Sequence, residues 1–535
     1  MTTTPYNEQA LEALIEKHLT GYTTEELRKQ YPSLPAFLDE QELYLTRDAY
    51  ILGSPGDFDR TYALDTRRFW SFLENTQAEE LDKLKALGPD WKLKILERFD
   101  RKIKREGVLR LLKKGLEVDN ACFTLFYEAP AAGSAQKVFD RFTQNQFSVT
   151  RQVRYSQANP LEEIDMVLFV NGIPLCTIEL KNAWTGQTAA VQGISQYKNT
   201  RDASQPLLSF GRCLVHFAVD TDEVYMTTKL QGKDTVFLPF NKGNNFGKGN
   251  PVNPGGHRTA YLWEEIFDKK VLAQIIQHYM LLGGDEKDPF AKRFYIFPRY
   301  HQLDVVRKLM ADVRQNGVGH TYLIQHSAGS GKSNSITWTA FQLIEIEDGD
   351  RPMFDSVIVV TDRRILDRQL KENIRSFSEI KNIVAHAHTS GDLRAALESG
   401  RRIIITTIQK FPYILNEIDS MADKRFGVII DEAHSSQGGH TADKMNQVLG
   451  AMEINEEGEI DAQDLIVRAM EARKMRRNAS YFAFTATPKT STLERFGIRD
   501  ADGGFRPFHL YSMKQAIEEG FILDVLANYT TYRSY

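Results

Sequence analysis

Cysteine is scarce in this chain, since only Cys122, Cys176 and Cys213 occur among 535 residues. Their spacing matches neither a disulfide framework nor a cysteine metal site. No stretch approaches the ~18 consecutive apolar residues of a membrane-spanning helix, and the N-terminus lacks the basic and apolar segments of a secretory signal. These absences exclude a disulfide-stabilised secreted scaffold and predict a protein of the reducing cytoplasm.

An excess of one charge is also missing. The chain has 67 Lys and Arg against 71 Asp and Glu, a net charge of −4, and its hydrophobic content of 42% is ordinary. Global charge therefore neither supports nor excludes a nucleic-acid partner, and any such binding has to come from local patches. Internal repeats and long low-complexity segments are absent as well. The length predicts three to four domains.

The most informative stretch that is present runs from Thr321 to Thr339. A β-rich segment enters a loop of small residues, and Lys332 and Ser333 lead from this loop into a helix-compatible segment. Backbone N–H groups of such a loop cradle phosphates, while the lysine reaches the terminal phosphates and the serine hydroxyl holds Mg²⁺. We therefore predict an ATP site in which His326 stands where glycine is usual. The predicted loop contacts are Gly329, Ser330, Gly331, Lys332 and Ser333.

The residues that follow this loop predict a parallel sheet. Strand-like segments at 356–360, 402–407, 426–430 and 481–484 alternate with helix-like ones. An acidic pair ends the third of these strands, where Asp431 would join the Mg²⁺ shell and Glu432 would orient or deprotonate the attacking water. Ahead of the loop, Gln302 could read the edge of adenine.

A second candidate site lies on a predicted hairpin. Two apolar strands meet at Asn171-Gly172, which is a strong hairpin signal. Asp165 opens the first strand, and Glu179 and Lys181 close the second. Two carboxylates and a lysine at paired strand ends can hold a divalent metal and activate water for attack on a phosphodiester. Solubilising charges at strand ends are the alternative explanation.

The turn of this hairpin decides whether the two carboxylates can meet. A strict two-residue connection would place Asp165 and Glu179 on opposite faces of the sheet, because side chains alternate along a strand. A shared metal site needs both on one face. We therefore predict a three-residue connection with Gly172 in a left-handed conformation.

Two helical regions precede the hairpin. In the helix expected from 7 to 18, Glu12 and Glu16 are predicted on a solvated face, with a nearby metal site as the alternative. The segment 91–117 is crowded with Lys and Arg. It could be either an ordinary solvated helix surface or a face that follows nucleic-acid phosphates.

Three motifs resemble, in order and spacing, the first motor domain of superfamily 2 helicases and translocases: HSAGSGKS at 326–333, DEAH at 431–434 and TATP at 485–488. The segment from RQVRYS to IDMVLFVNGIPLCTIELKN resembles a PD-(D/E)xK nuclease core, with a helix, an antiparallel meander, a helix and a further strand. A nuclease of this kind ahead of such a motor resembles the restriction (R, motor and endonuclease) subunit of type I restriction–modification enzymes.

This resemblance implies an α/β protein with three regions. Residues 1–290 would form a PD-(D/E)xK-like endonuclease domain (α+β) with a helical N-terminal part, and 291–505 a RecA-like ATPase domain with a parallel sheet. Residues 506–535 would begin a second RecA-like domain, so that we expect the chain to be an N-terminal portion of a longer protein. The implied ligands and partners are ATP, Mg²⁺, double-stranded DNA, and methyltransferase and specificity subunits.

The resemblance also assigns roles to individual residues. His434, Thr485 and Thr487 would couple the nucleotide state to domain movement, and Gln302 would contact adenine. The family's Gln-x3-Tyr pattern is one residue longer here, so either Gln192 or Gln196 could act in the nuclease site. Two other functions remain open: a superfamily 2 helicase with a non-catalytic N-terminal DNA-binding domain, and a non-catalytic DNA-binding scaffold.

Overall fold

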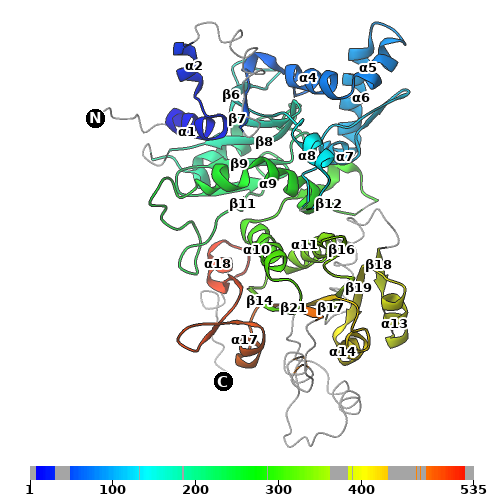
Figure 1. Cartoon of the computed structure of the whole chain (residues 1–535). Helices are drawn as coiled ribbons and strands as arrows, with labels where there is room; N and C mark the ends of the chain where they lie inside the picture. The colour runs from blue at the N-terminus through cyan, green and yellow to red at the C-terminus, as the bar shows by residue number, and fades with distance from the viewer. Residues whose placement is uncertain are drawn as a thin grey trace, which may run out of the picture. The chain divides into compact units, whose positions relative to one another are not determined.

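The computed structural model describes residues 8–30, 49–131, 133–182, 186–285, 287–361, 383–387, 389–431, 466, 470 and 478–523 (Figure 1). It divides the chain into two compact units. The first comprises Met1–Lys242 and Gly249–Arg299, and the second comprises Gly243–Lys248 and Tyr300–Tyr535. Among the helices that the structure describes, none has the length and apolarity needed to cross a membrane.

The first unit is built around a mixed seven-stranded sheet with the order β1-β6-β7-β8-β9-β10-β11. Its strands are β1 (Ile51–Leu52), β6 (Phe147–Arg154), β7 (Glu163–Val170), β8 (Ile173–Leu180), β9 (Val215–Val219), β10 (Val224–Thr227) and β11 (Leu238–Pro239). β6, β7 and β8 form an antiparallel meander, and β8 pairs in parallel with β9. The predicted nuclease-like order of meander, helical segment and further strand is confirmed.

Helices and short ribbons surround this sheet. The helices are α1 (Glu8–Thr20), α2 (Thr24–Gln30), α4 (Thr66–Thr76), α5 (Ala78–Lys85), α6 (Trp91–Glu106), α7 (Val108–Lys114), α8 (Gln136–Phe142) and α9 (Lys269–Gln274), with π-helical turns η3 (Ala189–Gly193), η4 (Gln196–Thr200), η5 (Leu262–Ile266) and η6 (Ile275–Tyr279) and 3-10 turns η1 (Pro55–Asp57) and η7 (Phe290–Lys292). The ribbons pair β2 (Phe58–Asp59) with β3 (Leu64–Asp65), β4 (Leu116–Val118) with β5 (Ala121–Phe123), and β12 (Leu281–Gly283) with β13 (Phe294–Ile296).

The hairpin of β7 and β8 turns at Asn171 and Gly172, whose φ angles of 52° and 76° lie in the left-handed region. Val170 pairs with Ile173, so the connection has two residues. Such short connections use left-handed residues because their twist matches that of the strands. The prediction of a three-residue connection is therefore wrong, although the conformation predicted for Gly172 is confirmed.

A β-bulge lies further along the same hairpin. Phe169 pairs with Pro174, whereas Leu168 pairs with Cys176, so that Leu175 is the extra residue on β8. One extra residue shifts the register by one, and a shift of one exchanges the faces from which side chains project. The bulge thus supplies the register change that the sequence analysis assigned to the turn.

The second unit contains a parallel seven-stranded sheet with the order β18-β19-β17-β20-β21-β14-β24. Its strands are β14 (Thr321–His326), β17 (Ser356–Thr361), β18 (Val384–His386), β19 (Ile403–Thr407), β20 (Phe426–Asp431), β21 (Ala479–Thr485) and β24 (His509–Tyr511). Two small ribbons pair β15 (Glu347–Asp348) with β16 (Arg351–Pro352) and β22 (Ile498–Arg499) with β23 (Phe505–Arg506). The four strands predicted after the phosphate loop and their parallel arrangement are confirmed.

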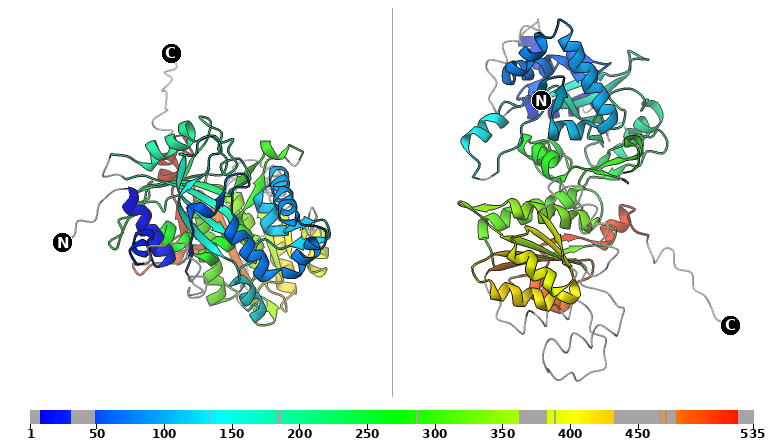
Figure 2. Two further views of the ribbon diagram at one scale, coloured as in Figure 1. Left: turned by 90° about the horizontal axis from the view of Figure 1, so that it is seen from above. Right: turned by 90° about the vertical axis from the view of Figure 1, so that its right-hand side faces the viewer.

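Helices cover both faces of this sheet (Figure 2). They are α10 (Tyr300–Asn316), α11 (Lys332–Glu345), α13 (Ser390–Glu398), α14 (Phe411–Ser420), α17 (Thr490–Phe496) and α18 (Met513–Glu518), with the 3-10 turn η8 (Ile408–Lys410). Ile358 and Val360 of β17 pack in one apolar cluster with α13 and α14. On another side, α11 contacts β17 and β20. The strands of this sheet are near-continuous apolar runs that are buried on both faces, as expected for a parallel sheet between two layers of helices.

The position of β24 corrects one domain boundary. β24 pairs in parallel with β14, the strand that enters the phosphate loop. Residues 509–511 therefore complete the parallel sheet of the second unit, so the expectation that a second domain begins at residue 506 is wrong for this strand. A short strand at the sheet edge gains its hydrogen-bond partners only from the folded neighbour, which a local pattern does not reveal.

Candidate active sites

Asp165 on β7 and Glu179 on β8 lie side by side in the first sheet. Beyond the bulge, Met166 pairs with Ile178, so the next positions along the two strands are opposite one another and project from the same face. The Oδ2 atom of Asp165 also accepts a hydrogen bond from the backbone N–H of Leu180 at 2.7 Å. The structure thus brings together the two carboxylates that were predicted to share a site.

Glu179 is completely buried. Arg201 donates from Nε to Glu179 Oε1 at 2.7 Å, whereas Oε2 has no hydrogen-bond partner within the described part of the chain. Burial, together with the charge of Asp165, raises the pKa of Glu179 well above its ordinary value. A buried oxygen without a partner beside a second carboxylate fits Mg²⁺, which binds proteins through one or two carboxylates and keeps several waters.

Lys181 follows β8 directly, two positions after Glu179. Its Nζ donates to the carbonyl of Leu180 at 2.8 Å and forms an ion pair with Glu8 of α1 at 3.3 Å. The side chain is largely buried. Helix α1 therefore reaches the hairpin end that carries the predicted nuclease residues.

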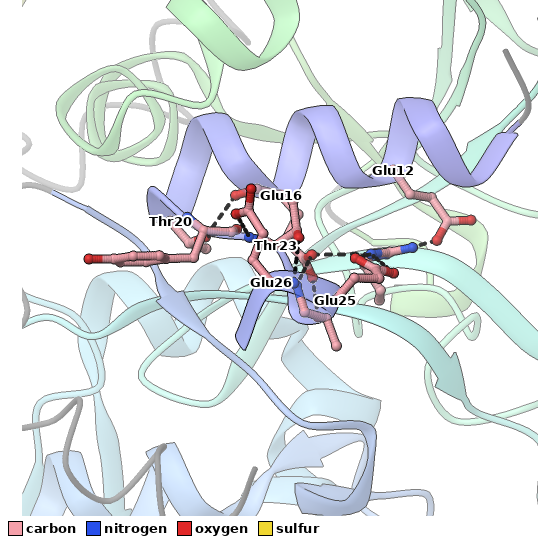
Figure 3. A network of polar contacts seen from close by, with 9 residues as sticks. Glu12, Glu16, Thr20, Thr23, Glu25 and Glu26 are labelled. Carbon is pink, nitrogen blue, oxygen red and sulfur yellow. Dashed lines mark hydrogen bonds and ion pairs between the residues drawn. The ribbon is translucent and has the colours of Figure 1, made fainter. Parts of the chain in front are cut away.

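Arg151 on β6 binds three carboxylates from α1 and α2. Figure 3 labels these carboxylates, Glu12, Glu16 and Glu25. Its Nε donates to Glu12 at 2.9 Å, and its Nη1 donates to Glu16 at 3.1 Å and to Glu25 at 2.9 Å. Thr24 donates to Glu16 from its backbone N–H and from its hydroxyl, both at 2.7 Å. Glu12 and Glu16 are only 4% and 0% exposed, so the prediction of a solvated face is wrong. Buried carboxylates persist here because a buried arginine compensates them.

The pKa of Glu12 is also affected by Asp165, one of the predicted nuclease residues. Burial raises the pKa of Glu12 to about 7, the hydrogen bond and charge of Arg151 oppose the rise, and the charge of Asp165 adds to it. Helix α1 thereby brings a third carboxylate within electrostatic range of the hairpin. In the described ranges, no group of three or more His, Cys, Asp and Glu side chains is arranged to hold a metal ion. The fit to Mg²⁺ thus depends on Asp165 and Glu179.

The segment between β8 and β9 accounts for the longer spacing of Gln192 and Tyr197. Its turns η3 and η4 are π-helical, with hydrogen bonds between residues five apart, and this wider turn accommodates one additional residue. Tyr197 is buried, with its hydroxyl 2.7 Å from Thr177 Oγ1. The Oε1 atom of Gln192 accepts from the backbone N–H of Thr188 at 2.8 Å. Whether Gln192 or Gln196 acts in the nuclease site stays open.

The predicted phosphate loop lies between β14 and α11. Gly329 and Gly331 have φ angles of 71° and 74°, which glycine adopts without strain. Lys332 Nζ donates to the carbonyl of His326 at 3.3 Å, so that the lysine folds back over the loop. Ser333 is the second residue of α11. Its hydroxyl therefore lies at the helix N-terminus, where phosphate and its metal are bound in sites of this type.

His301 and Gln302 of α10 hold the same loop. The His301 Nε2 atom lies 2.9 Å from the carbonyl oxygen of Ser330, and the Gln302 amide donates to the carbonyls of Ser330 at 3.0 Å and Gly331 at 3.1 Å. The ring of His301 stacks on Tyr511 at 3.8 Å. Contact of Gln302 with adenine stays a prediction, and in this structure its amide supports the loop.

The side chain of His326 is directed into the fold. It is fully buried, and its Nε2 lies 2.8 Å from Nδ1 of His509. His509 Nε2 lies 2.9 Å from Asp304 Oδ2. The histidine that replaces the usual glycine thus joins α10, β14 and β24 through polar contacts.

The other predicted motor residues lie at the ends of parallel strands. Asp431 ends β20 and Thr485 ends β21, and both are buried. β21 lies between β20 and β14, so the carboxyl ends of all three strands reach the edge where β14 enters the phosphate loop. Thr487 is exposed two residues beyond β21. Glu432 and His434 lie outside the described residues.

Comparison with known families gives one match in each unit of the chain. Residues 5–235 match the family model described as type I restriction enzyme R protein N terminus, and residues 301–456 match that of the SWI2/SNF2 ATPases. The first match contains the hairpin site, and the second contains the phosphate loop. The chain is similar in sequence to the R subunits of type I restriction enzymes. An N-terminal nuclease-like domain followed by a helicase-type ATPase domain is confirmed.

Individual proteins that are similar to this chain are also named as subunits of type I restriction enzymes. The chain is 25% identical over 437 residues to the type I restriction enzyme HindI endonuclease subunit of Haemophilus influenzae, a match that covers 80% of this chain and 38% of that protein. It is 26% identical over 399 residues to the SsaAORF53P endonuclease subunit of Staphylococcus saprophyticus, covering 72% and 36%. The chain thus spans less than two-fifths of the length of these curated relatives.

A solved fragment of a putative HsdR subunit from Vibrio vulnificus YJ016 is 15% identical and covers 70% of this chain and 56% of its own. Its TM-score of 0.28 is too low to support an argument about the fold. The similarity to R subunits therefore depends on the sequence matches.

The arginines that bind these carboxylates in the first unit were not predicted from the sequence. Arg201 is 22 positions from Glu179, and Arg151 is 139 positions from Glu12. No short spacing connects such residues. The one available signal was Arg151, which alternates in β6 with the apolar Phe147, Val149 and Val153 and so needs a counter-charge when that face is buried.

Proposed function

We propose that this chain acts as part of an ATP-dependent DNA translocase and type I endonuclease. It would cleave unmodified double-stranded DNA in the cytoplasm, together with methyltransferase and specificity subunits. The observation that carries this proposal is the pairing of Asp165 with the buried Glu179 next to Lys181, in a chain that also contains a phosphate loop. The kinship with R subunits supports it.

The nuclease chemistry follows from the donor set. Asp165 and Glu179 would hold Mg²⁺ through carboxylate oxygens, Glu179 through its unpartnered Oε2. Such an ion, when bound, neutralises phosphate charge and lowers the pKa of a coordinated water. Lys181 can exchange its contact with Glu8 for a phosphodiester oxygen, and Arg201 keeps the Glu179 carboxylate in a fixed orientation.

The ATPase chemistry is assigned to the second unit. Lys332 would bind the terminal phosphates, Ser333 and Asp431 would hold the nucleotide's Mg²⁺, and the neighbouring backbone groups would bind phosphate oxygens. The remaining proposed roles are adenine contact for Gln302, water orientation for Glu432 and coupling for His434, Thr485 and Thr487.

Cleavage of unmodified plasmid DNA, in the complex with its partner subunits and with ATP and Mg²⁺, tests the proposal. Glu179→Ala should abolish cleavage while ATP hydrolysis continues, and Lys332→Ala should abolish both. Glu163→Ala, a change to a more exposed carboxylate on β7, is the matched control and should cleave normally.

A second function makes the opposite prediction. If the first unit is a non-catalytic DNA-binding domain ahead of a helicase, Glu179→Ala leaves every activity of the complex unchanged. Full cleavage by this variant would therefore replace the nuclease assignment with the helicase one.

A further inference from the structure

The helices α6 and α7 concentrate positive charge in a chain that is acidic as a whole. Between Trp91 and Lys114 there are ten Lys and Arg against three Asp and Glu, a net charge of +7, whereas the whole chain has −4. Charge of one sign on a single surface element creates a local potential that the net charge of the protein conceals.

Helix α6 separates its charged and apolar residues onto opposite faces. Ile95, Phe99 and Ile103 are buried at four-residue intervals, and the ring of Phe99 packs against Phe69 of α4 at 5.6 Å. The outward face carries five cations, and Glu97 is the acidic residue among them. These cations are Lys94, Arg98, Arg101, Lys104 and Arg105.

The internal ion pairs of this face leave it available for a ligand. Lys104 pairs with Asp100 at 2.7 Å and Arg105 pairs with Glu106, but the side chains of Lys104 and Arg105 remain 72% and 69% exposed. Exposed ion pairs contribute about 0–1 kcal/mol, so they exchange readily for another anion.

We propose that the outward face of α6 is a binding surface for the phosphate backbone of double-stranded DNA. From Lys94 to Arg105 the helix rises about 16 Å at ~1.5 Å per residue. One strand of B-DNA presents about five phosphates over that length, at ~3.4 Å each along the axis. Five cations thus face about five phosphates. This inference rests on the proposed function, because it assigns a surface to the DNA of that reaction.

This surface is separate from the nuclease residues. Helix α6 packs on α4, and α4 adjoins the turn of the β7–β8 hairpin, since a Cβ on Gly172 would lie 2.2 Å from the carbonyl of Asp65 and 2.5 Å from the backbone nitrogen of Phe69. Glu179 lies seven residues from that turn, which is about 23 Å along a strand at ~3.3 Å per residue. The α6 face would therefore hold the duplex at a distance of about seven base pairs or more from the cleavage site.

A protein partner is the alternative occupant. Trp70 and Trp91 lie edge to face at 5.6 Å, with Lys92 over both rings, and Leu93 is 49% exposed at the same end of α6. Such an aromatic cluster suits a protein interface. The five cations lie along the outward face of the helix, and their charge favours the nucleic acid.

Salt-dependent binding of a 40-base-pair duplex to the full chain, without divalent cations, tests the proposal. The variant Lys94→Gln, Arg101→Gln, Lys104→Gln and Arg105→Gln removes four cations and keeps a good helix former at each position. We expect affinity at 100 mM salt to fall about tenfold or more, and the slope of log K against log salt to become shallower by up to ~3.6, at ~0.9 per lost phosphate contact.

The matched control changes four exposed cations elsewhere in the first unit, and its slope should stay within about one unit of the wild type. These are Lys137, Lys233, Arg258 and Lys287, each to Gln.

The outcomes separate this inference from the function on which it rests. An unchanged slope and affinity in the α6 variant, with DNA cleavage by the complex intact, overturns the inference alone. If the α6 variant binds DNA normally but no longer assembles with the partner subunits, the face is a protein interface and the inference is equally overturned. Absence of duplex binding by the wild-type chain and by its complex overturns the inference and the proposed function together.

Discussion

Removal of the Arg201 guanidinium is the sharpest test of the hairpin site, because it needs no assumption about activity. Arg201→Met keeps most of the side-chain volume but deletes the donor that lies 2.7 Å from Glu179 Oε1. Glu179 is 0% and Arg201 11% exposed, so this is a buried pair. Breaking such a pair by removal of one partner costs about 3–5 kcal/mol, because it leaves an uncompensated buried charge. Where Glu179 is ionised, we expect a loss of unfolding free energy at the lower end of this range, about 3 kcal/mol, because Arg201 is partly exposed to solvent.

The pH dependence has a definite sign. The pKa of Glu179 is raised by burial above its ordinary value. Its contribution to stability is therefore fully present below the unfolded-state pKa and is lost as the pH rises through the folded-state pKa. Without Arg201 the charged form is still less favourable, so the stability deficit of Arg201→Met should be small in acid and should grow as the pH rises.

Thermal unfolding of the first unit, measured at pH 5 and pH 8, tests this reasoning. Arg154→Met, which changes a 56% exposed arginine on β6, is the control and should remain within about 0.5 kcal/mol of the wild type. The double variant Glu179→Gln, Arg201→Met should lose less unfolding free energy than the two single variants lose in total, because each single change removes the same interaction. Additive losses, or an Arg201→Met protein as stable as the control, would refute the buried-pair interpretation.

Three further outcomes follow from the same structure. Because the pKa of Glu12 is raised to about 7, its carboxyl reduces stability as the pH rises from about 4.5 to 7. Glu12→Gln should therefore make the thermal unfolding midpoint less dependent on pH over that range. A plot of midpoint against pH that runs parallel to that of the wild type would contradict the assignment. Gly172→Ala should destabilise the first unit by about 2 kcal/mol or more, since it places a Cβ at a φ of 76° and 2.2 Å from a backbone carbonyl, and calorimetry measures this loss. Lys332→Ala should lose ATP affinity in a fluorescent-nucleotide titration, whereas Glu179→Ala should retain it, because the two residues lie in different units; equal affinities of all three proteins would contradict the phosphate-loop assignment.

Several structural features depend on residues that are close together in the sequence, and these features could be predicted from the sequence alone. Asn171-Gly172 predicts a turn because both residues adopt the left-handed conformation easily, and the structure has this turn. The glycine loop before Lys332, and the apolar strands that alternate with helices, depend on short-range spacing and were equally apparent. The parallel sheet of the second unit and the resemblance of the first unit to R subunits could therefore be expected before any coordinates were known.

Register could not be obtained in this way. Whether Asp165 meets Glu179 depends on one bulged residue, Leu175, and nothing in the local sequence distinguishes a bulge in the strand from a longer turn. Each alternative changes the register by one, and packing against the rest of the sheet selects between them. The requirement that the carboxylates share a face was a correct chemical argument, but it did not specify where the shift occurs.

Burial and ion pairing were likewise decided by the tertiary structure. Glu12 and Glu16 have the pattern of a solvated helix face, yet Arg151 of a distant strand buries and compensates both. Arg201 approaches Glu179 only because the π-helical segment returns across the sheet. Such contacts join residues far apart in sequence, and their free energy depends on the local dielectric, which exists only once the chain has folded.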